Sequence, residues 1–223
     1  LLGLTISLIG SVWMYQKVQG AAQKDFDIAA QRVAYEIQRR YEASTATLFG
    51  ARGFFNASQF VDRAEFATYA QSRNAQGDVK GVQGLGYLEK VERSGRERFI
   101  AYEHARGAAW FDIRTIVNDT MDPLYVVKYL EPAGPYHPAL GVDFGSERQR
   151  RETIERAIEA GAVTLSPALS IANDTVAQQY LMLPVYRGLD DVATAALRRK
   201  QFYGLVYVPL VPSALLADQP DVN

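Results

Sequence analysis

A long stretch without proline, residues 17–49, is the feature that most restricts what this chain can fold into. Proline breaks helices because it lacks a backbone N–H, and glycine, which also weakens them, occurs in this stretch only at Gly20. Apolar residues recur through the stretch at spacings mostly of three or four, at Val18, Ala22, Phe26, Ala29, Val33, Ile37 and Leu48. This periodicity predicts one long amphipathic helix. The same stripe can form the seam of a parallel dimer, although alanine, glutamine and serine residues interrupt it.

The residues that precede this helix carry no charge up to Gln16. Trp13 and Tyr15 come just before Lys17, an order typical of a membrane helix that leaves the hydrocarbon through an aromatic belt. A full span needs about 20 residues, and the chain starts without methionine, so we interpret residues 1–16 as the C-terminal part of a transmembrane helix. A signal peptide and a buried helix of a soluble domain are the alternatives.

Three shorter helices are marked by residues typical of helix ends. The capping-box spacing, in which a side chain and a backbone N–H satisfy each other, occurs at Asp62 with Glu65, Ser94 with Glu97, and Ser146 with Gln149. We expect the first helix over residues 63–73. Gly107 and Gly161 stand where a left-handed glycine would end the second and third helices.

Segments rich in β-branched and aromatic residues lie between these helices. They are bounded by Gly, Pro, Asp or Asn and predict five strands, over residues 82–91, 109–116, 124–131, 178–187 and 202–210. Strands and helices do not alternate regularly, so the order favours an α+β fold with an antiparallel five-stranded sheet covered by helices, rather than a parallel sheet. We expect residues 188–201 to form an exposed hairpin excursion.

Composition excludes several classes of function. Lys plus Arg is 24 against 25 for Asp plus Glu, so the formal charge of −1 offers no surplus to bind a nucleic acid backbone. The chain has no cysteine, which excludes thiolate catalysis, disulfides and cysteine metal sites. The two histidines, His104 and His137, have no partner spacing for a metal site. We therefore expect no catalytic residues, no metal and no cofactor in this segment.

Several individual residues are candidate ligand contacts. Glu131, at the end of an apolar strand, can accept hydrogen bonds from a ligand or hold the proline-rich loop after it. Tyr125 and Tyr129 are two residues apart and are predicted to face one side of their strand, as are Leu181 and Leu183 on theirs. Such stripes form either plain core or the apolar wall of a pocket.

Two further features of the sequence favour structural roles. Asp143 is predicted to hold backbone amides or pair with Arg148 before the third helix. The run "ERQRRE" is interpreted as a solvated helix face, with Glu147 and Arg151, and Glu152 and Arg156, at helix-neighbour spacing.

The chain resembles the CHASE family of extracytoplasmic sensor domains, found in membrane histidine kinases and nucleotide cyclases and including the plant cytokinin receptors. The resemblance covers about residues 51–209 and rests on blocks in the family's order: "ARGFFNAS…DRAEFATYA", "VQGLGYLEKVERSGRERF", "YLEP", "ALGVDFGSERQRRETIERAIEAG", "TLSPAL" and "LMLPVYR". The family implies two PAS-like lobes on a membrane-anchored helix, with a small ligand in the membrane-distal lobe. It thus implies four parts: a membrane segment, a stalk, a distal PAS-like lobe and the start of a proximal region, over residues 1–16, 17–55, 56–212 and 213–223.

The resemblance also implies where a ligand would bind. We expect contacts from Tyr87, Tyr125, Tyr129, Glu131, Leu165, Ser166, Leu181, Leu183, Tyr203 and Gly204. The plant receptors bind the adenine ring with an aspartate, where this chain has Pro132 or Gly134 with Glu131 nearest. They also have a pocket threonine where this chain has Leu165 beside Ser166. These two differences weaken the case for an adenine-type ligand and leave the expectation of a small-molecule ligand unchanged.

The resemblance favours an extracytoplasmic small-molecule sensor domain held in the inner membrane, with the domain in the periplasm or outside the cell. The parent is expected to be a sensor histidine kinase, or alternatively a diguanylate cyclase or phosphodiesterase. We expect partners of three kinds: a small-molecule ligand, the membrane through the N-terminal helix, and a second copy through the stalk; nucleic acid is not expected. A membrane-tethered periplasmic hydrolase and a purely protein-recruiting domain are the alternatives of other classes.

Overall fold

The computed structural model describes residues 2–74, 84–117, 120–132, 138–169, 178–188 and 192–211. The chain divides into two compact units, Leu1–Glu42 and Ala43–Asn223. The predicted ligand-binding residues all lie in the second unit. His137 and Gly134 lie outside the described residues.

Helix α1 (Leu2–Ala57) confirms the predicted long helix and continues through its whole predicted length without interruption. The absence of proline from α1 explains this continuity, because no residue in it lacks the backbone N–H that a helix needs. Large apolar side chains of α1 are exposed in the first unit, among them Phe26, Tyr35 and Ile37. Within the described part of the chain, no helix combines the length and apolar character needed to cross a bilayer.

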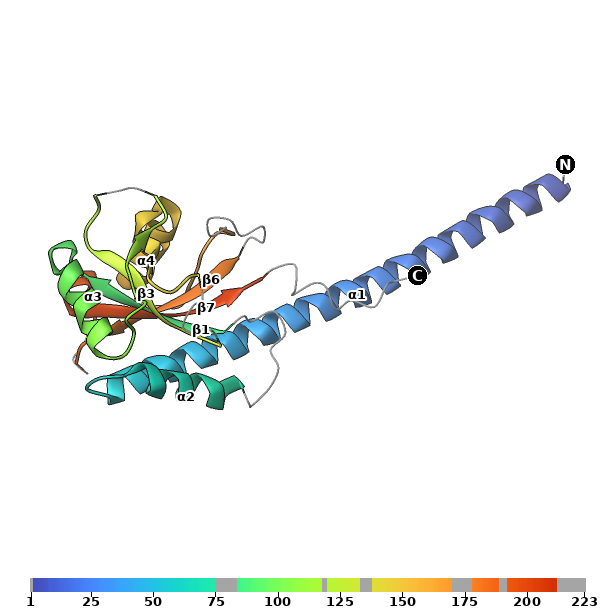
Figure 1. Ribbon diagram of the computed structural model, residues 1–223. Helices are drawn as coiled ribbons and strands as arrows, with labels where there is room; N and C mark the ends of the chain where they lie inside the picture. Colours follow the sequence, from blue (N-terminus) through green and yellow to red (C-terminus); the bar gives the residue numbers. More distant parts are fainter. Residues whose placement is uncertain are drawn as a thin grey trace. The chain divides into compact units, whose positions relative to one another are not determined.

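The second unit is built on one sheet of seven strands (Figure 1). The long strands are β1 (Leu85–Val91), β3 (Leu124–Glu131), β6 (Gln179–Tyr186) and β7 (Phe202–Leu210). Two-residue strands are β2 (Arg114–Thr115), β4 (Val142–Asp143) and β5 (Thr164–Leu165). The strand order is β2-β4-β3-β1-β7-β6-β5, and every pair is antiparallel except β2 with β4.

The prediction of a five-stranded antiparallel sheet was therefore wrong in number and in being purely antiparallel. Four of the predicted strands are present, and two of them, residues 124–131 and 202–210, have the predicted bounds. The predicted strand 109–116 is mostly a loop, in which Phe111 and Ile113 pack into the core and only Arg114–Thr115 pairs. The prediction of a hairpin excursion at residues 188–201 missed α5 (Ala195–Gln201).

The predicted capping box at Asp62 and Glu65 and the predicted glycines at helix ends were correct. Asp62 Oδ1 accepts the N–H of Glu65 at 2.8 Å, and Glu65 Oε2 accepts the N–H of Asp62 at 2.9 Å, before α2 (Arg63–Asn74). The prediction for Gly161 is also confirmed, because this residue ends α4 (Arg148–Ala160) in the left-handed conformation with φ 66°. Gly107 has φ 90° just after α3 (Arg96–Ala105), and its N–H bonds to the carbonyl of His104.

The other two capping boxes were wrong. A short 3-10 turn, η1 (Arg93–Gly95), precedes α3, whose N-cap is Gly95 without a side-chain bond. At α4 the N-cap is Glu147, whose carboxylate accepts two backbone N–H groups, after the 3-10 turn η2 (Phe144–Ser146). Each 3-10 turn shifts the helix start away from the serine, so the serine loses the capping position.

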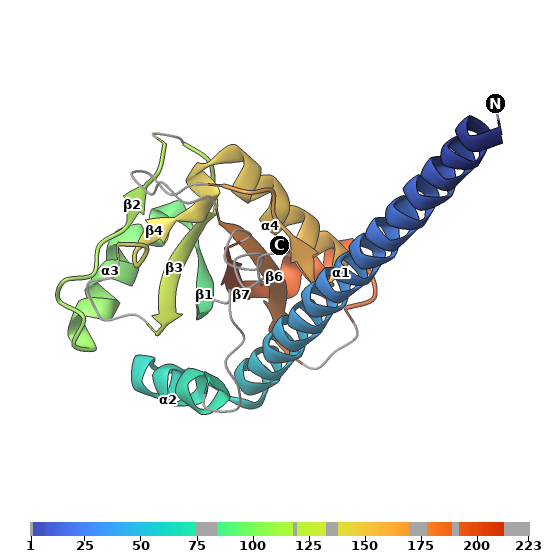
Figure 2. The same cartoon turned by 90° about the vertical axis from the view of Figure 1, so that its right-hand side faces the viewer.

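Helices cover both faces of the sheet (Figures 1 and 2). Helix α2 and the last turns of α1 pack on one face through a buried cluster that includes Leu48, Phe55, Phe66 and Val206. Helix α4 packs on the other face. A third cluster lies under α3. We call the first face the α1 face and the second the α4 face.

Candidate functional site

The ten predicted ligand-binding residues do not come together in one place. Tyr129, Leu181 and Leu183 belong to the core cluster of the α1 face. Tyr125 belongs to the cluster of the α4 face. The prediction that Leu181 and Leu183 share a face is confirmed, but they lie in packed core.

The prediction that Tyr125 and Tyr129 face the same side was wrong. The register of β1 with β3 shifts between Tyr87 and Leu88, which pair with Tyr129 and Val127. Lys128 is therefore the extra residue of a β-bulge, which disturbs the alternation of side chains along the strand. Tyr129 consequently packs on the α1 face, where Phe66 stacks on it at 5.1 Å.

Three rings form an aromatic cluster on the α4 face: Phe144, Tyr180 and Tyr207. The ring centroids lie 5.2 Å apart for Phe144 and Tyr180, 5.6 Å for Phe144 and Tyr207, and 5.9 Å for Tyr180 and Tyr207. These spacings are typical of favourable aromatic pairs. Gly86 of the neighbouring strand makes room for the cluster, because a Cβ on this residue would collide with the Tyr207 ring.

The hydroxyl of Tyr207 is the polar group of this cluster. Tyr207 is 1% exposed, and its hydroxyl has no hydrogen-bond partner within the described part of the chain. Burial, together with the nearby Tyr180, raises the pKa of Tyr207 well above its ordinary value, so it stays protonated and able to donate. Buried hydroxyl groups are nearly always hydrogen-bonded, so this one suits a partner other than the described residues.

The guanidinium of Arg150 lies beside the aromatic cluster. Arg150 is 1% exposed, and its Cζ lies 5.2 Å from the Phe144 ring centroid and 5.9 Å from that of Tyr180. Its Nη1 is 3.6 Å from Oε2 of Glu147, which is longer than a hydrogen bond. This contradicts the interpretation of "ERQRRE" as a solvated face: Arg150 and Arg151 are buried. The ion pairs formed in this helix are Arg148 with Glu152, Arg150 with Glu147, and Arg151 with Glu155.

Ser166 adjoins this cluster, whereas Leu165 does not. The Ser166 hydroxyl accepts the N–H of Tyr180 at 2.8 Å and donates to the carbonyl of Pro167 at 2.7 Å. Leu165 is 43% exposed. Glu131 ends β3 and pairs with Leu85 of β1, half-buried at the sheet's end.

Asp143 has the structural role predicted for it. Its Oδ1 accepts the N–H groups of Tyr125 at 2.8 Å and Gly145 at 2.9 Å. Arg151 completes this turn by donating to the carbonyls of Gly145 and Pro123. Backbone pairing and buried guanidinium contacts thus fix the segment from β4 into α4, and with it the position of Phe144 and Arg150.

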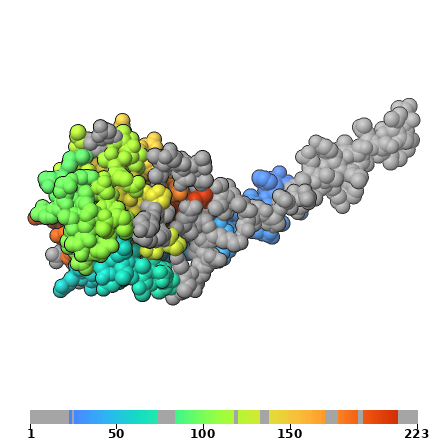
Figure 3. Space-filling view, in the orientation of Figure 1, coloured from blue at the N-terminus to red at the C-terminus, as the bar shows by residue number. Residues whose placement is uncertain are grey.

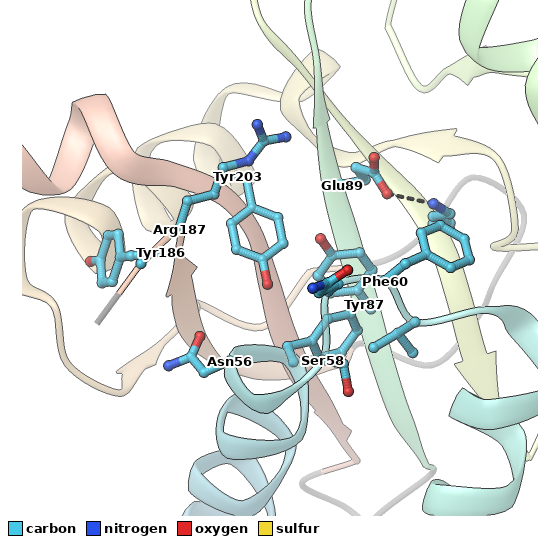
Figure 4. A pocket seen from close by; sticks show the side chains of 13 residues that line it. Asn56, Ser58, Phe60, Tyr87, Glu89, Tyr186, Arg187 and Tyr203 are labelled. Carbon is cyan, nitrogen blue, oxygen red and sulfur yellow. Dashed lines mark hydrogen bonds and ion pairs between the residues drawn. The ribbon is translucent and has the colours of Figure 1, made fainter. Parts of the chain in front are cut away.

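The remaining predicted residues, Tyr87, Tyr203 and Gly204, lie on the α1 face. Tyr87 and Tyr203 line a cavity of about 470 Å³ between the end of α1, the connection to α2 and the sheet (Figure 4). Gly204 allows this arrangement, because a Cβ there would collide with the Tyr87 hydroxyl. The candidate residues therefore divide between two faces of the sheet.

Sequence reasoning missed the aromatic cluster because it followed the other stripe of β6 (Gln179–Tyr186). Tyr180 and Met182 alternate with the chosen Leu181 and Leu183 along β6, and the opposite stripe faces α4. Arg150 lies four residues before Ile154, a spacing that places both on the buried face of α4. This spacing is the signal in the sequence that could have predicted the burial of Arg150.

No group of three or more His, Asp and Glu side chains among the described residues is placed to hold a metal ion. The buried phenol and guanidinium instead suit reversible binding of a small polar molecule in an aromatic surrounding.

Comparison with known proteins agrees with this architecture. The family model of the CHASE domain matches residues 59–222. Among solved structures, the chain is similar to an extracellular ligand binding receptor from Desulfohalobium retbaense DSM5692, with a TM-score of 0.51 and 13% identity. The match covers 86% of this chain and 26% of the receptor, and at this identity it shows the fold alone. No curated protein sequence matches the chain.

Proposed function

The chain belongs to the CHASE domain family, and on that premise we propose that it is the extracellular small-molecule sensor domain of a transmembrane signalling receptor. The segment itself is not an enzyme. Residues 56–212 are the membrane-distal sensor lobe in this proposal, and residues 213–223 begin a membrane-proximal region.

The buried hydroxyl of Tyr207 is the observation that carries the proposal. A phenol placed in the core without a partner costs free energy, about 1–3 kcal/mol, unless a ligand accepts or donates a hydrogen bond. The guanidinium of Arg150 lies beside the rings of Phe144 and Tyr180, and these two rings contact the Tyr207 ring. We therefore place the ligand on the α4 face, next to Ser166 and the end of β3 at Glu131.

The finer parts of the proposal rest on the family resemblance. We propose that the parent protein is a sensor histidine kinase, with a diguanylate cyclase or phosphodiesterase as the alternative output. A cytokinin-like ligand fits an aromatic cluster, since flat heterocycles stack on such rings. A carboxylate ligand fits the buried guanidinium equally well.

The N-terminal helix supplies the proposed link to the membrane. The uncharged residues 1–16 followed by Lys17 support anchoring in the inner membrane, with the domain on its outer side. The exposed apolar side chains of α1 support pairing with α1 of a second copy. Ligand binding would signal only through a difference in affinity between two arrangements of the domain.

A thermal-shift screen of the purified chain against adenines, amino acids and organic acids tests this function. At about 100 times its Kd a ligand adds about 2.7 kcal/mol to the free energy of unfolding, which gives a clear rise in Tm. We expect Tyr207→Phe to remove about half of the rise, as a tenfold higher Kd would, and Glu131→Ala to reduce it with little change in the ligand-free Tm. Tyr186→Phe, whose hydroxyl donates to the carbonyl of Ile158, is the matched control and should keep the rise. A rise that is the same in Tyr207→Phe would exclude the α4 face as the ligand site.

A further inference from the structure

The cavity on the α1 face is separate from the proposed ligand site. It holds about 470 Å³, within the range of about 300–1,000 Å³ typical of small-molecule pockets. Its walls come from the last turn of α1, the connection to α2, strands β1, β3 and β7, and the end of β6 (Figure 4). Because the sheet lies between them, a molecule in this cavity cannot contact the aromatic cluster of the α4 face.

Aromatic side chains line the cavity on both sides. Phe55 and Phe60 come from the α1 side, and Tyr87 and Tyr203 come from the sheet. Phe55 stacks on Tyr87 with a centroid distance of 4.2 Å and an interplanar angle of 21°. Figure 4 shows the Tyr203 hydroxyl directed toward the end of α1, where Asn56 lies. These walls suit a planar ring that carries a hydrogen-bonding group.

The charged side chains among the described lining residues leave one cation, Arg187, available. Lys128 is buried and its Nζ lies 2.6 Å from Oε2 of Glu89, so these two lining residues neutralise each other. Arg187 is exposed at the rim, with its Cζ 5.6 Å above the Tyr203 ring. No carboxylate within the described residues forms an ion pair with Arg187. Among the described lining residues, the balance is therefore one positive charge beside aromatic side chains.

We infer that this cavity is a second binding site, for a small aromatic carboxylate whose ring lies between Tyr87, Tyr203 and Phe60 and whose carboxylate pairs with Arg187. A guanidinium above a ring is well placed for this, because it can pair with a carboxylate through two parallel hydrogen bonds. Asn56 and Ser58 offer hydrogen bonds to a polar group on the far side of the ring. The occupant contacts the end of α1 directly.

Calorimetric titration of the purified chain with 4-hydroxybenzoate tests the inference. We expect saturable binding that Arg187→Gln weakens by at least about tenfold, the usual effect of losing a charge-assisted pair. The neutral analogue 4-hydroxybenzamide should bind more weakly to the unchanged chain and should not respond to Arg187→Gln. Acetate, which lacks the ring, should not bind measurably.

Two control variants separate this site from the rest of the molecule. Arg148→Gln removes another exposed arginine, on α4, and should leave binding of 4-hydroxybenzoate unchanged. Tyr207→Phe should also leave it unchanged, because it alters the α4 face. Absence of binding up to about 10 mM, or equal affinity in Arg187→Gln, would overturn the inference. Weakening by Tyr207→Phe but not by Arg187→Gln would overturn it too, while supporting the proposed function.

Discussion

Tyr207 and Tyr186 carry the same hydroxyl in two different surroundings. The Tyr186 hydroxyl is buried and donates to the carbonyl of Ile158 at 2.9 Å. The Tyr207 hydroxyl is buried in the aromatic cluster without a partner among the described residues. The bonded Tyr186 hydroxyl therefore stabilises the fold. Burial of the Tyr207 hydroxyl without such a bond costs free energy unless a ligand is bound.

This difference predicts that Tyr186→Phe and Tyr207→Phe have different effects on the free energy of unfolding. Without ligand, Tyr186→Phe should lower it by about 1 kcal/mol, because a buried carbonyl loses its donor. Tyr207→Phe should leave it unchanged within about 0.5 kcal/mol or raise it, because a desolvated hydroxyl is removed. Urea unfolding of both variants measures this. An equal loss in the two would mean that the Tyr207 hydroxyl has a structural partner.

Some of these residue roles were predictable from the sequence and others were not. The role of Asp143 followed from its position before a helix, where short side chains often accept backbone N–H groups. Arg150 was misjudged because a run of charges usually means a solvated face. Its burial depends on which face of α4 meets the sheet, and that is decided by tertiary packing.

At the scale of elements, buried ion pairs join α2, α3, β1 and β3. Nζ of Lys128 lies 2.6 Å from Oε2 of Glu89 and 3.4 Å from Oε1 of Glu103, and Arg63 pairs with Glu103 at 3.2 Å. Figure 3 shows the surfaces of α2 (cyan) and the α3 region (green) meeting on one face of the molecule. The β-bulge at Lys128 is what directs this side chain toward the helices.

Lys128→Met should therefore destabilise the protein strongly. Burial alone would lower the pKa of Lys128, but Glu89, Tyr129 and Glu103 raise it above its ordinary value. Removing the lysine leaves Glu103, which is 4% exposed, with less compensation, and breaking a buried pair in this way costs about 3 kcal/mol. Lys90→Met, which removes a more exposed pair with Glu92, should change the free energy of unfolding by only about 0.5 kcal/mol. Similar losses in chemical denaturation of the two variants would contradict the network.

The strands show where prediction from sequence ends. Long strands such as β3 and β7 were predicted to the residue because composition and boundaries agree over their whole length. Strands β2, β4 and β5 have two residues each, too few to produce a periodic pattern. The bulge in β3 leaves no mark in the sequence either, and it alone reverses the predicted face of Tyr129.

For the whole molecule, buried tyrosines determine the response to alkaline pH. Burial raises the pKa of Tyr125, Tyr129, Tyr186 and Tyr203 from 10.0 to about 12. The folded chain therefore keeps these protons at a pH where the unfolded chain loses them. The free energy of unfolding should be unaffected below about pH 10 and should fall steadily between about pH 10 and pH 12. Urea unfolding at stepped pH measures this, and stability that stays constant to pH 12 would contradict the shifts.

Pairing of α1 between two copies is testable because the natural chain has no cysteine. Ile37 lies on the apolar stripe of the predicted seam and is 42% exposed, whereas the Arg39 side chain, 63% exposed, lies off this stripe. In membranes, Ile37→Cys should form a disulfide-linked dimer under mild oxidation, and Arg39→Cys should form far less. Equal crosslinking at the two positions, or none at Ile37→Cys, would count against a specific seam.

The ligand position that we propose could not be predicted from the sequence, because it depends on knowing which face of each strand meets which helix. Calorimetric titration, with the ligand that gives the largest thermal shift, tests the central claim that the α4 face holds that ligand. We expect Tyr207→Phe to raise the Kd of this ligand by about tenfold and Tyr186→Phe to leave it unchanged. One and the same Kd for the unchanged chain and for Tyr207→Phe would contradict this claim.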